Sequence, residues 1–287
     1  MYRGNTKATM QLHIAGICFS IEFDVDLDAF KERVRTFFAR FTGDDEPPDF
    51  IIQVTQRPAG IKKTSLIKRR DWLYSENTRS STYVAGPVTI LVSWITRKVS
   101  VHVIEDPQED VSVLKNVLRM LVSFGAILKG GVPLHCSALI QDDTTAIFMG
   151  PEESGKSTIA GLLQPRWALL NDEYNIALPE SGSYILHPTP FRCRESEKMP
   201  PQKHGGLVLF AIAKAPANAI VALRKPQAFH ALLKSTYSFP ATDALAQKLF
   251  DNIGKLCTQI PVYQLSFKKC PSVCDTVNEF ILKDPGR

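Results

Sequence analysis

The chain has 287 residues, of which 44% are apolar and 22% charged, a composition close to that of soluble globular proteins and far from that of disordered chains. Its 34 basic and 29 acidic residues give a net charge of +5, an excess that suits an anionic ligand but does not indicate a nucleic-acid-binding protein. The six cysteines are scattered, and the close pair Cys270 and Cys274 has C-x-x-x-C spacing, which indicates reduced thiols.

The hydrophobic pattern predicts neither a secretory signal nor a membrane partner. The apolar patch over residues 14–21 is short and is followed directly by acidic residues. The most apolar long stretch, residues 111–134, contains Lys115, Arg119 and Lys129, whereas a membrane span requires roughly 20 nearly uncharged residues. We therefore expect a cytoplasmic protein.

Residues 1–108 are predicted to form a small α+β domain. Strands are expected on both sides of Gly16 within residues 10–23 and over 49–55, 89–95 and 99–104, and a helix over 27–41. The last two strands suggest a hairpin over residues 96–98. The basic run Ile61–Arg70 suggests a nucleic-acid or phosphopeptide patch or a solvated edge, and the second interpretation is favoured because no stacking aromatic series accompanies it.

Residues 109–287 alternate between strand and helix patterns, which predicts an α/β domain. A helix is expected over residues 110–129, followed by strands over 133–140 and 144–149, a glycine-rich loop and a helix over 156–163. Later strands are expected over residues 167–170, 174–178, 184–187, 207–213 and 262–267, and later helices over 227–234, 243–259 and 271–282.

The loop Gly150–Ser157 reads GPEESGKS and matches the Walker A pattern G-x-x-x-x-G-K-S. In this pattern the glycines let backbone amides approach phosphates, Lys156 directs a cation toward the β- and γ-phosphates, and the Ser157 hydroxyl coordinates Mg²⁺. The preceding buried strand and the following helix start are the context that the motif requires. The sequence therefore predicts binding of a purine nucleoside triphosphate, MgATP first among them, through Gly150, Glu153, Ser154, Gly155, Lys156, Ser157 and Thr158. The side chains of Glu152 and Glu153 are expected to face solvent, because acids that face a triphosphate would repel it.

The next acidic residue at a strand edge is Asp172, sixteen residues after Lys156. That spacing leaves room for one short helix and one strand, and it is shorter than is usual for the Walker B acid of nucleotide-switch proteins. A carboxylate at this place is expected to serve the phosphate site, although a helix cap or a turn residue is the structural alternative.

This spacing, together with His135 fifteen residues before Gly150, resembles the catalytic domain of HPr kinase/phosphorylase and the wider group of HPr-kinase-like serine kinases. The family pattern is a histidine at the start of one strand, a second strand, the glycine loop, and an acidic pair at the end of the next strand. The segment His187–Phe191 falls where members carry a Thr-Pro-aromatic turn. The resemblance extends over about residues 115–285 and is strongest over 133–176.

The resemblance implies an HPr-kinase/phosphoenolpyruvate-carboxykinase-like P-loop core and an ATP-dependent kinase. It implies in-line transfer of the γ-phosphoryl group to a hydroxyl, with Asp172 and His135 as catalytic residues and Ser157, Asp172 and Glu173 as ligands of Mg²⁺. The acceptor would be a hydroxyl-bearing peptide, protein or small molecule, with a ribosomal peptide suggested by analogy with related kinases in peptide-modifying pathways. Because HPr kinases form hexamers, the resemblance also suggests a homo-oligomer.

One departure from the family concerns the acidic pair. HPr kinases carry Asp-Asp where this chain has Asn171-Asp172-Glu173. If Asn171 takes the first position, Asp172 is the remaining acid, with Glu173 beside it; and since strand residues alternate faces, these two are not expected to point the same way. This speaks against the phosphorolysis activity of HPr kinases, and the missing downstream signature speaks against HPr as the acceptor.

Several alternatives stay open at the level of the sequence. His135 is either functional or a satisfied core histidine. Arg192 and Arg194 form either a phosphate clamp or surface salt bridges, while Cys193 lacks an identifiable histidine partner and is not expected to be a nucleophile. The chain could also be a non-catalytic ATP-binding regulator or scaffold, an alternative that Asn171 favours, or a nucleic-acid-associated ATPase that uses the basic run.

Overall fold

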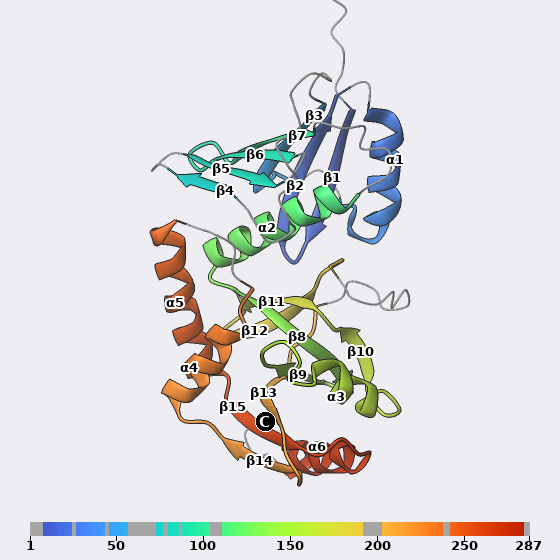
Figure 1. The fold of residues 1–287 in the computed structure, drawn as a ribbon, viewed down its shortest axis with the longest axis vertical. Coiled ribbons are helices and arrows are strands. Elements are labelled where there is room, and N and C mark those ends of the chain that lie inside the picture. Colours follow the sequence, from blue (N-terminus) through green and yellow to red (C-terminus); the bar gives the residue numbers. More distant parts are fainter. Residues whose placement is uncertain are drawn as a thin grey trace, which may run out of the picture. The chain divides into compact units, whose positions relative to one another are not determined.

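The computed structural model describes residues 8–24, 27–43, 46–56, 73–76, 80–85, 88–103, 111–191, 203–237 and 242–283. The chain divides into two compact units, Met1–Gly125 and Ala126–Arg287. This division lies within helix α2 (Ser112–Leu128), whereas the boundary expected from the sequence, after residue 108, lies before that helix. Each unit has its own mixed β-sheet (Figure 1).

The sheet of the first unit has seven strands in the order β1-β2-β3-β7-β6-β5-β4. The β2–β3 and β3–β7 pairs are parallel and the other pairs antiparallel. The strands are β1 (Ala8–Ile14), β2 (Ile17–Phe23), β3 (Phe50–Gln56), β4 (Leu73–Glu76), β5 (Ser80–Ala85), β6 (Val88–Ser93) and β7 (Lys98–Val103). Helix α1 (Asp28–Phe37) and the short 3₁₀ helix η2 (Ala39–Phe41) connect β2 to β3, as parallel neighbours require.

Two helical segments pack in the first unit through aromatic side chains. Phe30 of α1 meets Phe23 of β2 edge to face at 6.2 Å, and Phe124 of α2 lies 5.2 Å from the ring of Trp94. The hairpin expected over residues 96–98 is confirmed as the β6–β7 connection. Strands β4 and β5 were not predicted, and the basic run Ile61–Arg70 lies outside the described residues.

The sheet of the second unit has eight strands in the order β12-β11-β8-β9-β13-β15-β14, with β10 paired to β8. The β9–β13 and β13–β15 pairs are parallel. The strands are β8 (Val132–Gln141), β9 (Thr144–Met149), β10 (Ala168–Asn171), β11 (Tyr174–Glu180), β12 (Ser183–Pro188), β13 (Leu207–Lys214), β14 (Ala219–Ala222) and β15 (Val262–Phe267). The helices are α3 (Lys156–Leu163), α4 (Lys225–Lys234), α5 (Asp243–Gln259) and α6 (Ser272–Lys283).

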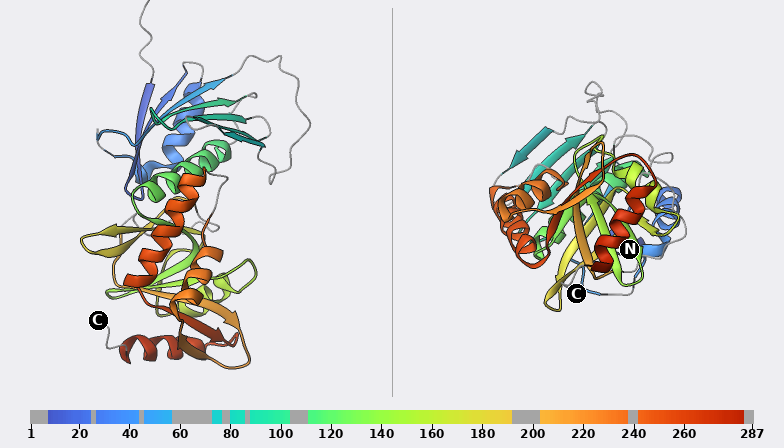
Figure 2. Two further views of the ribbon diagram at one scale, coloured as in Figure 1. Left: turned by 90° about the vertical axis from the view of Figure 1, so that its left-hand side faces the viewer. Right: turned by 90° about the horizontal axis from the view of Figure 1, so that it is seen from below.

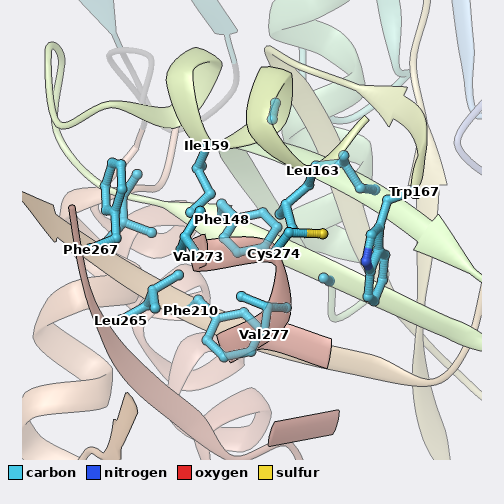
Figure 3. Packing of buried hydrophobic residues seen from close by; sticks show 14 of the residues in the cluster. Phe148, Ile159, Leu163, Trp167, Phe210, Leu265, Phe267, Val273, Cys274 and Val277 are labelled. Atoms are coloured by element: carbon cyan, nitrogen blue, oxygen red, sulfur yellow. The ribbon is translucent and has the colours of Figure 1, made fainter. Parts of the chain in front are cut away.

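The core of the second unit lies between this sheet and helices α3 and α6. Ile159 and Leu163 of α3 and Val273 of α6 pack on the stacked rings of Phe148 and Phe210, whose centroids are 5.3 Å apart (Figure 3). Helices α4 and α5 pack against each other on the other side of the sheet (Figure 2). The apolar face of α3 therefore anchors the helix that follows the glycine loop.

Strand β8 changes its neighbours in the middle. On one edge it pairs first with β11 through residues 132–135 and then with β10 through residues 138–140. On the other edge the segment 235–237 lies beside residues 133–135, and β9 pairs with residues 136–141. Both changes occur at His135 and Cys136, so the ends of four segments meet around this point of β8.

The α/β class expected for the second unit is confirmed, and each element predicted within residues 109–287 has a counterpart. Strand β14 was missed, because its four residues are mostly exposed and carry little hydrophobic pattern. No helix in the described part of the chain is both long and apolar enough to cross a membrane.

Candidate functional site

The glycine loop connects the buried end of β9 to the first turn of α3 (Figure 1). Gly155 is the N-cap of α3 with φ of +106°, and as a glycine it offers no side chain to hydrogen-bond to the amides of the first turn. Amides at a helix N-terminus have no partner within the helix and carry partial positive charge. The first turn of α3, which contains Lys156, Ser157 and Thr158, thus presents uncapped amides to an anion.

Steric crowding explains why glycine occupies both fixed positions of the motif. A Cβ on Gly150 would lie 2.8 Å from Oγ of Ser154, and a Cβ on Gly155 would lie 2.8 Å from the ring of Phe267. The loop between them is tight enough to hold Glu153 in the left-handed region at φ of +62°. A side chain in this conformation costs about 1–2 kcal/mol, so the packing of the loop imposes its shape on the backbone.

Lys156 is 8% exposed, and its ammonium group lies on the loop itself. Nζ donates hydrogen bonds to the carbonyl oxygens of Gly150, at 2.8 Å, and Pro151, at 2.9 Å. The cation is therefore held at the centre of the loop by neutral acceptors, which a phosphate oxygen can replace with a stronger charge-assisted bond.

A cavity of about 580 Å³ opens in front of the loop. It brings together most of the residues that the sequence predicted: His135, Glu153, Gly155, Lys156, Ser157, Thr158, Asp172 and Glu173. Glu152 and Lys214 complete its lining. Of the remaining predicted residues, Gly150 lines a neighbouring cavity and Ser154 lines neither; its hydroxyl is buried without a hydrogen-bond partner among the described residues.

The acidic residues lie in a bend between β10 and β11 rather than within a strand. Both Asp172 and Glu173 line the cavity. The alternation of strand residues, on which the expectation of opposite directions rested, does not apply to a bend. Asp172 is only 6% exposed, and its carboxylate has no hydrogen-bond or ion-pair partner in the described part of the chain. Because Asp172 lines the cavity, a cation or a hydrogen-bond donor that enters this space can bind its carboxylate.

Asn171 has a structural role and does not line the cavity. Its side chain is fully buried; Nδ2 donates to the carbonyl oxygens of Tyr174 and Thr189, and Oδ1 accepts from the Glu173 amide at 3.0 Å. The Thr189 hydroxyl donates to the same Tyr174 oxygen at 2.6 Å. The amide of Asn171 and the Thr-Pro turn together fix the bend that carries the two acids.

His135 stands at the point where β8 changes neighbours, on the wall of the cavity. Its backbone amide donates to Ser235, and its ring stacks on Tyr237, with centroids 5.9 Å apart and planes 9° apart. Tyr174, its cross-strand partner on β11, meets the same Tyr237 ring edge to face at 5.2 Å. These rings hold the imidazole in place.

A second cavity, of about 300 Å³, adjoins the first. The two share His135, Glu152 and Glu173 as a common wall. The second cavity is otherwise lined by Gly150, Pro151, Lys234, Thr236 and Tyr237.

A family model described as SynChlorMet cassette protein ScmC matches residues 101–283, well over half of the chain. The chain belongs to the ScmC family. No curated protein matches it. Every residue that lines either cavity lies within the ScmC region.

The donor set of the larger cavity fits a magnesium ion. Ser157, Asp172 and Glu173 offer hydroxyl and carboxylate oxygens to one cavity, and the Ser157 hydroxyl, like the Asp172 carboxylate, has no partner among the described residues. Within the described residues no three His, Cys, Asp or Glu side chains are grouped to hold a metal ion. Magnesium characteristically uses one or two carboxylates and completes its shell with phosphate oxygens and water.

The described cysteine beside His135 is not suited to act as a nucleophile. Cys136 follows His135, but burial raises the pKa of its thiol to about 12, so it stays protonated. Arg192, Cys193 and Arg194 lie outside the described residues.

The sequence did not indicate Lys214, Lys234 or Tyr237, which also line the two cavities. Lys214 ends β13, which runs parallel to β9, and ligands of α/β sheets bind beyond the carboxyl ends of such strands, so its position could have been inferred. Lys234 and Tyr237 reach the site through the isolated pairing of Thr236 with Leu134, which leaves no local signal in the sequence.

Proposed function

We propose that this ScmC-family chain is an ATP-dependent kinase that transfers the γ-phosphoryl group to a serine-like hydroxyl. We also propose that its second unit is a P-loop core of the HPr-kinase/phosphoenolpyruvate-carboxykinase type. The observation that carries the proposal is the cavity of about 580 Å³, in which the glycine loop, the uncapped start of α3 and Asp172, whose carboxylate makes no hydrogen bond or ion pair with the described residues, line the same space.

The phosphate chain would be bound by the loop and by two cations. Lys156 and the amides of the first turn of α3 supply positive charge from one side of the cavity. Lys214 supplies a second ammonium group; it makes no ion pair or hydrogen bond with the described residues, and its Cε would lie 3.7 Å from a Cβ on Gly155. Such fixed charges lower the barrier to phosphoryl transfer mainly by positioning and charge neutralisation.

Ser157, Asp172 and Glu173 are the residues that would hold Mg²⁺, which neutralises charge that develops on the phosphate oxygens when it is bound. Asp172 would accept or orient the proton of the acceptor hydroxyl, because its carboxylate faces the cavity with no competing partner among the described residues. Glu173 is a second candidate for this role, since it lines both cavities. His135 would bind the transferring group or orient the acid.

A non-catalytic ATP-binding regulator is the competing function, and Asn171 was the feature that favoured it. The buried hydrogen bonds of Asn171 weaken that argument, because two acids, Asp172 and Glu173, line the cavity beside it. The description of the family as a cassette protein names no activity. The acceptor could therefore be a peptide, a protein or a small molecule, and a peptide rests on analogy with kinases of peptide-modifying pathways.

Label transfer from γ-labelled ATP tests the proposal. We would incubate the pure protein with Mg²⁺, labelled ATP and an extract of its source, and compare the wild type with Lys156→Ala, Asp172→Asn and Glu173→Gln. We expect a discrete labelled acceptor with the wild type, loss of ATP binding with Lys156→Ala, and retained binding without transfer with Asp172→Asn.

Lys248→Ala, on α5 and away from both cavities, is the matched control for removal of a lysine. If ATP binds and Lys156→Ala abolishes binding, but no label moves under any condition, the protein is a regulator and the kinase proposal is wrong.

A further inference from the structure

We propose that the smaller cavity is the acceptor site and that it selects a hydroxyl group with a carboxylate close to it. This inference rests on the proposed kinase function and names the class of acceptor. The acceptor is a free hydroxy acid or a hydroxyl residue of a peptide that has a carboxylate nearby; the two share the same recognition chemistry.

The positions of the two cavities along the loop assign their roles. The larger cavity is lined by the end of the loop and the first turn of α3, residues 155–158, where amides converge on phosphates. The smaller cavity is lined by the start of the loop, Gly150 and Pro151, whose carbonyl oxygens face the Lys156 ammonium. A phosphoryl group that leaves a nucleotide in the larger cavity would reach the smaller one across the shared wall of His135, Glu152 and Glu173.

The size of the smaller cavity limits the acceptor. Its volume of about 300 Å³ equals about ten water molecules at liquid density. A small molecule, or one side chain of a peptide with its adjoining backbone, fills such a space.

The charges around the smaller cavity orient the acceptor. The shared wall contributes the acids Glu152 and Glu173, so the end of the ligand that faces it must donate hydrogen bonds, as a hydroxyl does. On the other part of the lining, Lys234 ends helix α4 and makes no ion pair or hydrogen bond with the described residues. Lys234 is exposed to solvent, and a carboxylate placed against it forms a charge-assisted hydrogen bond while the hydroxyl faces the acids.

Thr236 does not offer a hydrogen-bond donor to a ligand in the smaller cavity. The Thr236 hydroxyl donates to the carbonyl oxygen of Leu232 at 2.9 Å, so its proton is used within the fold. The parallel rings of His135 and Tyr237 form a flat part of the lining. Lys234 is thus the cation that distinguishes a carboxylate from a neutral group.

The transfer step balances without another reactant. The acceptor oxygen forms a bond to the γ-phosphorus while the bond from that phosphorus to the β-γ bridging oxygen breaks. The hydroxyl proton passes to the carboxylate of Asp172 or Glu173, and ADP leaves with the bridging oxygen.

Binding to the protein loaded with a non-hydrolysable MgATP analogue tests the inference by calorimetry, independently of turnover. L-Serine and D-glycerate probe free hydroxy acids, and L-serinamide is the neutral control. Short peptides with a C-terminal serine, or with a serine before an aspartate, probe the second source. We expect the acids or the carboxylate-bearing peptides to bind and serinamide to bind weakly or not at all.

Lys234→Ala should weaken binding of the carboxylate probes about 10- to 100-fold while the nucleotide affinity stays unchanged. Lys225→Ala, at the other end of α4 and outside both cavities, should change neither. The inference is wrong if serine and serinamide bind equally, if no probe binds, or if Lys234→Ala weakens the nucleotide as well. Failure of the kinase proposal is distinguishable from these results, because ATP would then bind and Lys156→Ala would abolish that binding, but no label would move from ATP to any acceptor.

Discussion

At the residue scale, the two hydrogen atoms on Nδ2 of Asn171 explain why an asparagine occupies this position. Its Nδ2 donates to two buried carbonyl oxygens, those of Tyr174 and Thr189. An aspartate has the same shape but no donor, and its charge would face both oxygens inside the fold. The family resemblance, which suggested an acid near this position, thus conflicts with what the local backbone needs.

We predict that Asn171→Asp lowers the free energy of unfolding by about 3 kcal/mol or more, because it leaves an uncompensated charge among unsatisfied acceptors. Denaturant unfolding followed by circular dichroism measures the change. Asn218→Asp is the control, since the Asn218 amide donates to a single exposed hydroxyl, on Ser272. An Asn171→Asp protein as stable as the wild type would show that this carboxylate can replace the amide in the bend.

The same region shows what the sequence can predict. The Walker A residues and Asp172 follow from local patterns, and the structure brings them to one cavity. The placement of Glu173 beside Asp172 does not follow, because the bend depends on hydrogen bonds from Thr189, eighteen residues beyond Asn171. A pattern of alternating residues cannot reveal such a bond.

At the element scale, the hairpin of β11 and β12 and the segment that pairs with it contain two histidines, His187 and His204, whose charged form is disfavoured by burial. Burial lowers the pKa of His187, although the Glu180 carboxylate lies 2.7 Å from its Nε2 and opposes this shift. Burial also lowers the pKa of His204, whose backbone pairs with Leu186 of β12. Both rings are therefore neutral in the folded protein at neutral pH.

A histidine with a lowered folded-state pKa binds fewer protons in the folded than in the unfolded chain, so its contribution to stability is lost as the pH falls. We predict that the free energy of unfolding decreases as the pH falls from about 7.5 to 5.5, most steeply below the unfolded histidine pKa of about 6.5. The decrease is at most about 1.4 kcal/mol per pH unit for each group. Denaturant titrations across this range measure it.

His187→Gln and His204→Gln, combined, should flatten this pH profile. His230→Gln, on the exposed side of α4, should leave it as it is. A wild-type profile that is level from pH 7.5 to 5.5 would contradict the assignment.

Elements with a strong local pattern could be predicted from the sequence, and their arrangement could be predicted only in part. The β9-loop-α3 unit was found because the motif and its flanking hydrophobic runs are contiguous. Lys234 and Tyr237 of the smaller cavity were not found, because this segment reaches His135 through an isolated bridge between parts of the chain that are far apart in sequence.

At the scale of the whole molecule, the two compact units should respond differently to nucleotide. All residues of both cavities belong to the unit Ala126–Arg287. A ligand at 100 times its dissociation constant stabilises the folded state by about 2.7 kcal/mol. For a unit of this size we expect the midpoint of its unfolding to rise by about 5–10 °C with MgATP.

Hydrogen exchange locates this effect. We predict slower exchange in the glycine loop and in the bend at Asp172 and Glu173 when MgATP is added, and little change over residues 8–103. Lys156→Ala should abolish the protection. Protection confined to the first unit would place the nucleotide elsewhere.

The wall that the two cavities share has a thermodynamic consequence. His135, Glu152 and Glu173 face the occupants of both spaces, so the charge and proton state of one occupant alter the potential felt by the other. Coupling between two binding equilibria is reciprocal: by whatever factor the nucleotide changes the affinity for the acceptor, the acceptor changes the affinity for the nucleotide. Under the proposed assignment of the two cavities, an acceptor bound in the smaller one therefore alters the affinity of the larger one for ATP.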